Sequence, residues 1–262
     1  MNEVPARPPC AVDVDAVARV VVLGVPLINV TKEEAAQLLE CWIDDGKGRA
    51  RAVFIVNAHT LNLACDDHGF REVLRAGDAV FGDGTGVRWA ARMKGVAMRD
   101  NLVGTDLLPY CFTRSQREVR VFLLGSTAET VRRAAVHLEE TYARVRVAGA
   151  HHGYLDAVES SAVVRQINAA RPDMLLVAMG NPLQEQWIHE QRARLEVPVS
   201  IGVGGLFDHW GGNLRRAPTW VRRLGFEWLQ LMLQQPQKAR RYLAGNPRFV
   251  ARALRDAREN GA

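Results

Sequence analysis

Two patterns of apolar residues alternate along the chain. Short runs rich in β-branched residues predict buried strands, and longer stretches in which apolar residues recur every three or four positions predict amphipathic helices. Strands that alternate with helices are typical of βαβ units. The sequence therefore predicts an α/β, Rossmann-like fold, with a mostly parallel sheet and helices on both faces. The expected strands are residues 20–23, 52–56, 78–81, 119–124, 145–148, 174–178 and 199–203.

Two of the expected helices carry start signals. Thr31 is followed three residues later by Glu34, a capping box that predicts a helix through Trp42. Pro182 precedes the helical pattern of residues 183–195. Proline is well tolerated at the start of a helix because its missing N–H would have no partner there.

The pattern changes near residue 212, and no further strand is expected beyond it. We therefore expect two parts, an α/β domain of residues 1–212 and a helical appendage of residues 213–262. Short helices in the appendage, separated by proline and glycine, are predicted at residues 218–233, 237–243 and 247–258.

The net charge of +5 is distributed unevenly. Residues 215–262 hold 11 Lys/Arg against 3 Asp/Glu, whereas the preceding 214 residues hold 23 against 26. Aromatic and aliphatic residues lie among these arginines. A helix with a basic face beside an apolar face suits an anionic membrane surface. An appendage packed on the core with its arginines solvated would have the same composition, so both interpretations stay open.

Other features exclude several classes of protein. No apolar run reaches the roughly 20 residues that a membrane-spanning helix needs. The cysteines form no C-x-x-C pair and show no metal-ligand spacing, so we expect reduced thiols in a cytoplasmic protein. The His151-His152 pair has no cysteine or carboxylate at suitable spacing, so no metal site is expected. The cysteines are Cys10, Cys41, Cys65 and Cys111.

A glycine-rich segment follows the third expected strand. It reads Gly-Asp-Gly-Thr-Gly over residues 82–86 and precedes a helix expected at residues 87–94. Glycines permit tight turns and let a ligand approach the backbone. Because open α/β sheets bind ligands at the carboxyl ends of their strands, Asp83 is a candidate general base for a sugar hydroxyl. Two alternatives stay open, an aspartate that only caps the helix and an enzyme that binds S-adenosylmethionine or another nucleotide.

Three more strand ends carry polar side chains. Gln184 and Glu185 follow the sixth expected strand, where an amide can bind a base or a sugar, although Glu185 would also offset a helix dipole. Asp208 follows the seventh strand and is a candidate for holding a ribose hydroxyl. Asn57 follows the second strand, where it would contact a sugar or cap a helix. Together these strand ends predict one shared site.

Several motifs also occur in the order and at the spacing of one known family. They are Gly82-Asp83-Gly84, Gly104-Thr105-Asp106-Leu107, Gly180-x-Pro182-x-Gln184-Glu185, Gly202-Val203-Gly204-Gly205-x-Phe207-Asp208, Gly225-x-Glu227-Trp228 and Arg240-Arg241-Tyr242. With them the chain resembles the WecG/TagA/CpsF glycosyltransferases, glycosyltransferase family 26, over about residues 20–250. That family includes N-acetylmannosaminyltransferases of wall teichoic acid synthesis and exopolysaccharide glucosyltransferases.

The resemblance implies an inverting, metal-independent transferase that needs no cofactor and has no nucleic-acid partner. Its donor would be a UDP-sugar and its acceptor a sugar linked to undecaprenyl diphosphate, a polyprenyl diphosphate. The enzyme would work at the inner face of the cell membrane, held peripherally on the anionic surface by its appendage. Asp83 falls on the position of the catalytic base. The implied substrate-binding residues are Asn57, Thr60, Asn101, Gln184, Glu185, Asp208, Lys238 and Arg241, the last two closing over the diphosphate.

Two departures from the family pattern bear on the donor sugar. Asn101 stands where acetamido-sugar transferases carry an arginine, and Leu231 where an arginine is common. The first variant looks more like exopolysaccharide members that add glucose to lipid-linked glucose, so we expect UDP-glucose. One alternative is transfer from UDP-N-acetylmannosamine to lipid-linked N-acetylglucosamine. An alternative of another class is a non-catalytic adaptor that binds nucleic acid or a membrane through the basic tail.

Overall fold

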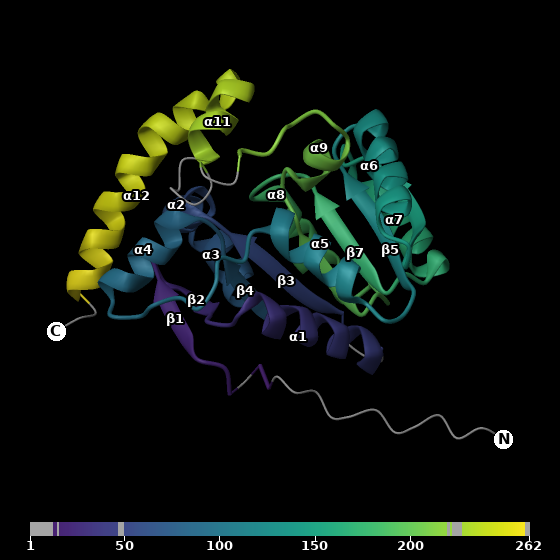
Figure 1. The fold of residues 1–262 in the computed structure, drawn as a ribbon, viewed down its shortest axis with the longest axis horizontal. Coiled ribbons are helices and arrows are strands. Elements are labelled where there is room, and N and C mark those ends of the chain that lie inside the picture. Colours follow the sequence, from purple (N-terminus) through teal and green to yellow (C-terminus); the bar gives the residue numbers. More distant parts are fainter. Residues whose placement is uncertain (1–12, 15, 47–49, 219–220, 222–226, 260–262) are drawn as a thin grey trace.

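The computed structural model describes residues 13–14, 16–46, 50–218, 221 and 227–259 and shows a six-stranded sheet covered by helices (Figure 1). Its strands are β3 (Arg51–Val56), β4 (Ala79–Gly82), β5 (Val119–Gly125), β6 (Val145–His151), β7 (Met174–Ala178) and β8 (Val199–Gly202). They lie in the order β4-β3-β8-β7-β5-β6, and every neighbouring pair is parallel. The predicted α/β class and parallel sheet are confirmed.

Helices cover both faces of the sheet. One layer consists of α1 (Lys32–Asp45), α5 (Gly104–Arg114), α6 (Ala128–Thr141) and α9 (Leu206–Trp210). The opposite layer consists of α2 (Ala58–Asp66), α3 (His68–Arg75), α7 (Ala157–Ala170) and α8 (Leu183–Gln191), while α4 (Thr85–Met93) packs at the edge of this second layer.

Strand side chains alternate between the two layers. Val53 and Ile55 belong to the core under α1 and α5, whereas Phe54 and Val56 belong to the core under α2 and α3. Because both faces are covered, β3, β4, β7 and β8 appear in the sequence as nearly continuous apolar runs, which is the signal that predicted them, whereas Val145 is the only buried residue of β6.

The first expected strand is one arm of a separate hairpin. β1 (Arg19–Val22) and β2 (Val25–Ile28) pair antiparallel and form their own two-stranded sheet. The turn between them places Leu23 and Gly24 at φ 51° and 79°, in the left-handed region. The second arm was not predicted, because Val25–Ile28 contains Pro26 and has no separate turn signal of the Asn-Gly type.

The predicted helix starts are observed. Thr31 accepts a hydrogen bond from the Glu34 N–H at 3.2 Å, and Glu34 accepts one from the Thr31 N–H at 2.9 Å. α1 continues three residues beyond the predicted end to Asp45, after which Gly46 adopts the left-handed conformation. α8 starts after Pro182 as predicted but ends at Gln191 rather than at residue 195.

The C-terminal helices differ from the prediction. Instead of breaking at Gly245 and Pro247, the chain forms one long helix, α12 (Ala239–Glu259), after α11 (Glu227–Gln234) and a short 3-10 turn, η1 (Pro236–Lys238). Pro247 removes a single helical hydrogen bond, and tertiary packing compensates for that loss. Most of residues 219–226 lie outside the described part of the chain.

α12 is docked on α2 and α4, beside which it runs in Figure 1. Phe249 and Ala253 are each 2% exposed and belong to the core of the second layer. Asn62 of α2 donates to the Gly245 carbonyl at 2.8 Å, and Lys94 pairs with Asp256 at 2.9 Å. Within the described ranges, no helix combines the length and the apolar character that crossing a bilayer requires.

The expectation of four reduced thiols is wrong for Cys41, which is disulfide-bonded. Cys65 and Cys111 are free thiols, as expected, and Cys10 lies outside the described residues. Spacing along the sequence says nothing about how closely two cysteines approach in space, and that approach decides whether they can pair.

Candidate active site

Four strand ends with predicted site residues are consecutive in the sheet. Asp83 follows β4, Asn57 follows β3, Asp208 lies beyond β8, and Gln184 lies beyond β7. The chain leaves β3 through α2 on one face of the sheet and leaves β8 through α9 on the other. Such a reversal between neighbouring strands is the place where open α/β sheets bind ligands.

Asp83 is half-buried, and its surroundings fix its backbone. Its N–H donates to the Val56 carbonyl at 2.8 Å, which continues the ladder between β4 and β3 by one residue. The following N–H, that of Gly84, donates to Asn101 Oδ1 at 2.7 Å. Gly84 has φ 90°, a conformation that glycine adopts without strain. Asn101 thus holds the turn that carries the candidate base.

Asn57 caps α2, as one of the two interpretations predicted. Its Oδ1 accepts from the N–H groups of His59 and Thr60 at 3.0 and 3.2 Å. The Thr60 hydroxyl is fully buried and lies 3.3 Å from the same oxygen. The side chain of Asn57 is therefore held rigidly at the end of β3, with Thr60 beneath it.

Gln184 and Glu185 form a buried chain of hydrogen bonds under the loop after β8. The Gly204 N–H donates to Gln184 Oε1 at 3.0 Å, and Gln184 Nε2 donates to Glu185 Oε1 at 2.7 Å. The amide of Asn181 donates to the same Glu185 oxygen. Gln184 and Glu185 are 1% and 0% exposed. The second carboxyl oxygen of Glu185 has no partner among the described residues.

Burial raises the pKa of Glu185 to about 7, against the opposing effect of hydrogen bonds from Gln184 and Asn181. Between the two pKa values, this carboxyl is protonated in the folded state but ionised in the unfolded state. Its contribution to the free energy of unfolding therefore has its full value below pH 4.5 and falls as the pH rises from about 4.5 to about 7.

We therefore expect Glu185 to lower the free energy of unfolding by roughly 2 to 3 kcal/mol between pH 5 and pH 8. Urea unfolding of wild type and Glu185→Gln at both pH values isolates this group, because all other titrating groups are common to the two proteins. An identical pH dependence in both would show that Glu185 is ionised throughout.

Asp208 is half-buried and belongs to a polar cluster that sequence patterns did not reveal. Its Oδ1 accepts from Asn213 Nδ2 at 3.2 Å, and the same amide donates to Thr130 Oγ1 at 3.0 Å. Farther along, Arg216 makes a two-bond ion pair with Asp106 at 2.5 and 3.2 Å. The loop after α9 is thereby tied to α5 and α6, beside the carboxyl end of β8.

The two cations predicted to close over a diphosphate are only partly described. Lys238 ends η1 and Arg241 lies in the first turn of α12, but their side chains lie outside the described part of the structure. The rings of His151 and His152 lie at the end of β6, with their centroids 4.3 Å apart and their planes tilted by 46°. Among the described residues, no three histidine, cysteine, aspartate or glutamate side chains gather as a metal site would require.

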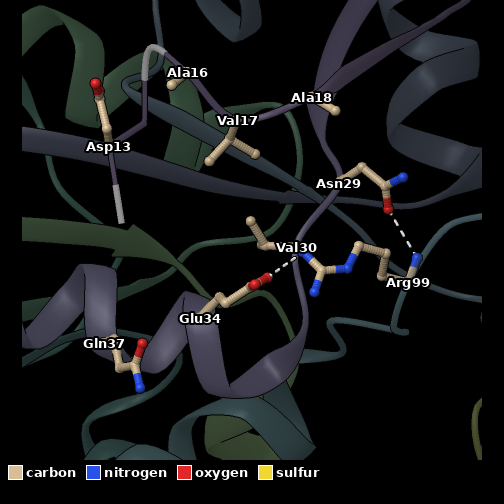
Figure 2. A pocket seen from close by; sticks show the side chains of 9 residues that line it. All are labelled: Asp13, Ala16, Val17, Ala18, Asn29, Val30, Glu34, Gln37 and Arg99. Atoms are coloured by element: carbon tan, nitrogen blue, oxygen red, sulfur yellow. Dashed lines mark hydrogen bonds and ion pairs between the residues drawn. The ribbon is translucent and has the colours of Figure 1, made fainter. Parts of the chain in front are cut away.

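A cavity of about 530 Å³ lies elsewhere, between the N-terminal segment and α1 (Figure 2). Figure 2 shows Arg99 reaching toward Glu34, with which it pairs at 2.6 Å. None of the predicted site residues lines this cavity, so it is separate from the strand ends. Its lining residues are Asp13, Ala16, Val17, Ala18, Asn29, Val30, Glu34, Gln37 and Arg99.

Comparison with known proteins gives matches over almost the whole chain. Residues 20–262 match the model of the glycosyl transferase WecG/TagA/CpsF family. An N-acetylglucosaminyldiphosphoundecaprenol N-acetyl-beta-D-mannosaminyltransferase of Bacillus subtilis is 29% identical over 234 residues, 89% of this chain and 90% of the relative. The protein of the same name from Staphylococcus aureus is 30% identical over 213 residues, 81% of this chain and 83% of the relative.

Proposed function

Because the chain belongs to the WecG/TagA/CpsF family of glycosyltransferases, we propose that it transfers N-acetylmannosamine from its UDP-linked form to N-acetylglucosamine carried on undecaprenyl diphosphate. The choice of these two sugars rests on the names of the two relatives. Family membership makes the chain a glycosyltransferase, and this excludes both the S-adenosylmethionine-binding enzyme and the non-catalytic adaptor.

The choice of N-acetylmannosamine replaces the expectation of UDP-glucose. That expectation rested on Asn101, which stands in place of an arginine. In the structure Asn101 accepts a hydrogen bond from the Gly84 N–H, so this residue acts on the turn beside Asp83. A side chain used to shape a turn is a weak indicator of the donor sugar, and the relatives then favour the acetamido sugar.

The proposed reaction is a single inverting displacement. The acceptor hydroxyl oxygen attacks the anomeric carbon of the donor as the bond from that carbon to the diphosphate breaks, and the hydroxyl proton passes to Asp83. UDP leaves with the electron pair. Lys238 and Arg241 would neutralise the charge that develops on the diphosphate, which is the usual way that cations accelerate such a departure. Asn57 and Asp208 would orient the sugars.

The proposal is tested by measuring sugar transfer from each of a panel of UDP-sugars to a synthetic N-acetylglucosamine-diphospholipid. We expect product from UDP-N-acetylmannosamine and an inverted configuration at the new bond. Product from UDP-glucose on a glucose-diphospholipid, with none from the acetamido donor, would restore the first expectation. No transfer from any donor, together with no binding of UDP, would contradict the proposal as a whole.

We further propose that α11 and α12 form the membrane-contacting surface. Leu243, Val250 and Leu254 are spaced by seven and four residues, which places them on one face of α12. They are 63%, 40% and 39% exposed, and the exposed Arg255 and Arg258 lie on the same helix. Exposed leucines beside arginines suit the surface of an anionic bilayer.

Replacing Leu243, Val250 and Leu254 together by glutamine is expected to weaken sedimentation with anionic vesicles by about tenfold or more, because each buried aliphatic side chain is worth ~1.5–3 kcal/mol. Transfer to a water-soluble acceptor should be preserved. The matched control is Val136→Gln with Val158→Gln, which changes exposed valines on α6 and α7. Equal sedimentation of all three proteins would favour an appendage that is only packed on the core.

A further inference from the structure

The chain just before α5 holds the Asp83 turn from both sides. On the carboxyl side of Asp83, Asn101 Oδ1 accepts from the Gly84 N–H at 2.7 Å. On the amino side, the Leu102 N–H donates to the Gly82 carbonyl at 3.2 Å. Leu102 is 1% exposed and so anchors this segment in the core. Because two neighbouring residues clasp the turn before and after the candidate base, a shift of this segment would move the base with it.

Asp100 connects the same segment to the start of α1. Its Oδ2 accepts from the Lys32 N–H at 3.0 Å, and its Oδ1 accepts from the Asn101 N–H at 2.8 Å. Lys32 is the first residue of α1, where a backbone N–H has no partner within the helix. A single half-buried carboxylate thus joins the end of a helix to the residue that holds Gly84.

The helix to which Asp100 is bound is itself fixed. Ala35 and Ala36, near the start of α1, are 0% exposed. Arg99 adds a second contact to the same helix, an ion pair with Glu34 at 2.6 Å, but its side chain is 50% exposed and solvent screens such a pair. The side chain of Asp100 is short and is bound to backbone at both ends, so it holds the segment more tightly than the ion pair does.

We propose that Asp100 is a positioning residue for the candidate base. It takes its position from α1 and acts through Asn101, which sets the turn that carries Asp83. Proton transfer requires the base to lie within hydrogen-bond reach of the proton, and a displacement of about 1 Å can lower the rate by ~10²-fold. The effect of Asp100 therefore falls on kcat and leaves donor affinity unchanged. The inference rests on the proposed function, since it requires Asp83 to be the base.

Steady-state transfer by Asp100→Ala, with the Kd for UDP measured alongside, tests this role. We expect kcat to fall by ~10- to 100-fold and the Kd to stay within about twofold of the wild-type value. Asp156→Ala is the matched control, because Asp156 Oδ1 also accepts from two backbone N–H groups, those of Val158 and Glu159, both at 2.8 Å. Asp156 caps α7, which follows β6 at the opposite edge of the sheet from β4. The control should lose stability and keep its kcat.

A double-mutant cycle with Asp83→Asn distinguishes positioning of the base from a general loss of structure. If Asp100 acts only through the base, its removal costs little once the base is gone. We therefore expect the kcat of the double variant to lie within about threefold of that of Asp83→Asn alone. Losses that multiply would show that Asp100 affects the reaction independently of Asp83, and this result would overturn the proposal.

The bond from α1 can also be removed without changing Asp100. Lys32→Pro deletes the donating N–H at the helix position where proline is best tolerated, and Thr31 before it has ψ 163°, the extended conformation that precedes proline. Lys32→Ala is the control. It also loses the side chain, whose Nζ lies 4.9 Å from the centroid of the Tyr110 ring, but it keeps the N–H. We expect kcat of the proline variant to be lower than that of the alanine variant by about threefold or more.

The outcomes separate the inference from the function on which it rests. If wild type transfers no sugar, the proposed function is wrong and the role of Asp100 falls with it. If wild type is active and Asp83→Asn is not, but Asp100→Ala keeps full kcat, the positioning role is wrong and the function stands. Should Asp100→Ala not fold, equal kcat in Lys32→Pro and Lys32→Ala would overturn the positioning role by itself.

Discussion

Replacing Asp83 by asparagine is expected to lower kcat by ~10²–10⁴-fold, the usual contribution of a positioned general base. The amide has nearly the same shape as the carboxylate but cannot take the acceptor proton. The backbone bonds that hold this turn, to Val56 and from Gly84 to Asn101, do not involve the Asp83 side chain. We therefore expect the variant to fold and to bind UDP as wild type does.

The measurement is steady-state transfer with UDP affinity determined alongside it. Asp67→Asn is the matched control, since it makes the same chemical change at the cap of α3, where it accepts from the Phe70 N–H at 3.0 Å. Asparagine caps helices as well as aspartate does, so this control should keep full activity. Turnover of Asp83→Asn near the wild-type value would assign the base to another residue.

Replacing Phe249 by alanine is expected to lower the free energy of unfolding by about 3 to 5 kcal/mol, the range for large aromatic residues in cores. Phe249 is 2% exposed and packs in the core of the second layer. A Cβ on Gly86, at the start of α4, would lie 3.4 Å from its ring. The side chain therefore joins α12 to the helix that begins directly after the Asp83 turn.

Urea unfolding followed by circular dichroism measures this effect without any substrate. The adjacent Val250 is 40% exposed on the outer side of α12, so Val250→Ala should change the free energy of unfolding by ~0.5 kcal/mol or less. Equal stability of the two variants would mean that α12 contributes little to the folded core. For the same reason, removing residues 213–262 would be a poor test of membrane binding, because it would also uncover the contacts of Phe249.

Most strands of the sheet were predictable because they are buried on both faces and so appear as nearly uninterrupted apolar runs, as in β3, β4, β7 and β8. Tertiary contacts determined the features that the sequence did not reveal. Pro247 predicts a helix end by its local chemistry, yet α12 continues through it because Phe249 and Ala253 are buried against the core. The pairing of Cys41 likewise depends on an approach in space that spacing cannot report.

The candidate site shows the same division. The strand-end segments of Asn57, Asp83 and Asp208 were identifiable because glycines and polar residues follow apolar runs there. The hydrogen bonds that connect these segments were not identifiable, because the two partners of each bond lie far apart along the chain. Asn101 is bound to Gly84, 17 residues earlier, and Gln184 to Gly204, 20 residues later. Because of its contact with Gly84, we interpret Asn101 as a residue that stabilises the turn beside Asp83, rather than as one that selects the donor sugar.

The order of the strands has a consequence for how the protein is made. β3 lies between β4, which follows it closely in the sequence, and β8, whose first residue comes 148 positions after the paired Arg51. At ~5–20 residues per second, a ribosome needs roughly 7 to 30 s to cover that distance. During this time the β8-facing edge of β3 has no partner, and such an apolar edge can pair with other chains. The strand that closes this gap is followed by Asp208, so this strand end of the candidate site is completed late in synthesis.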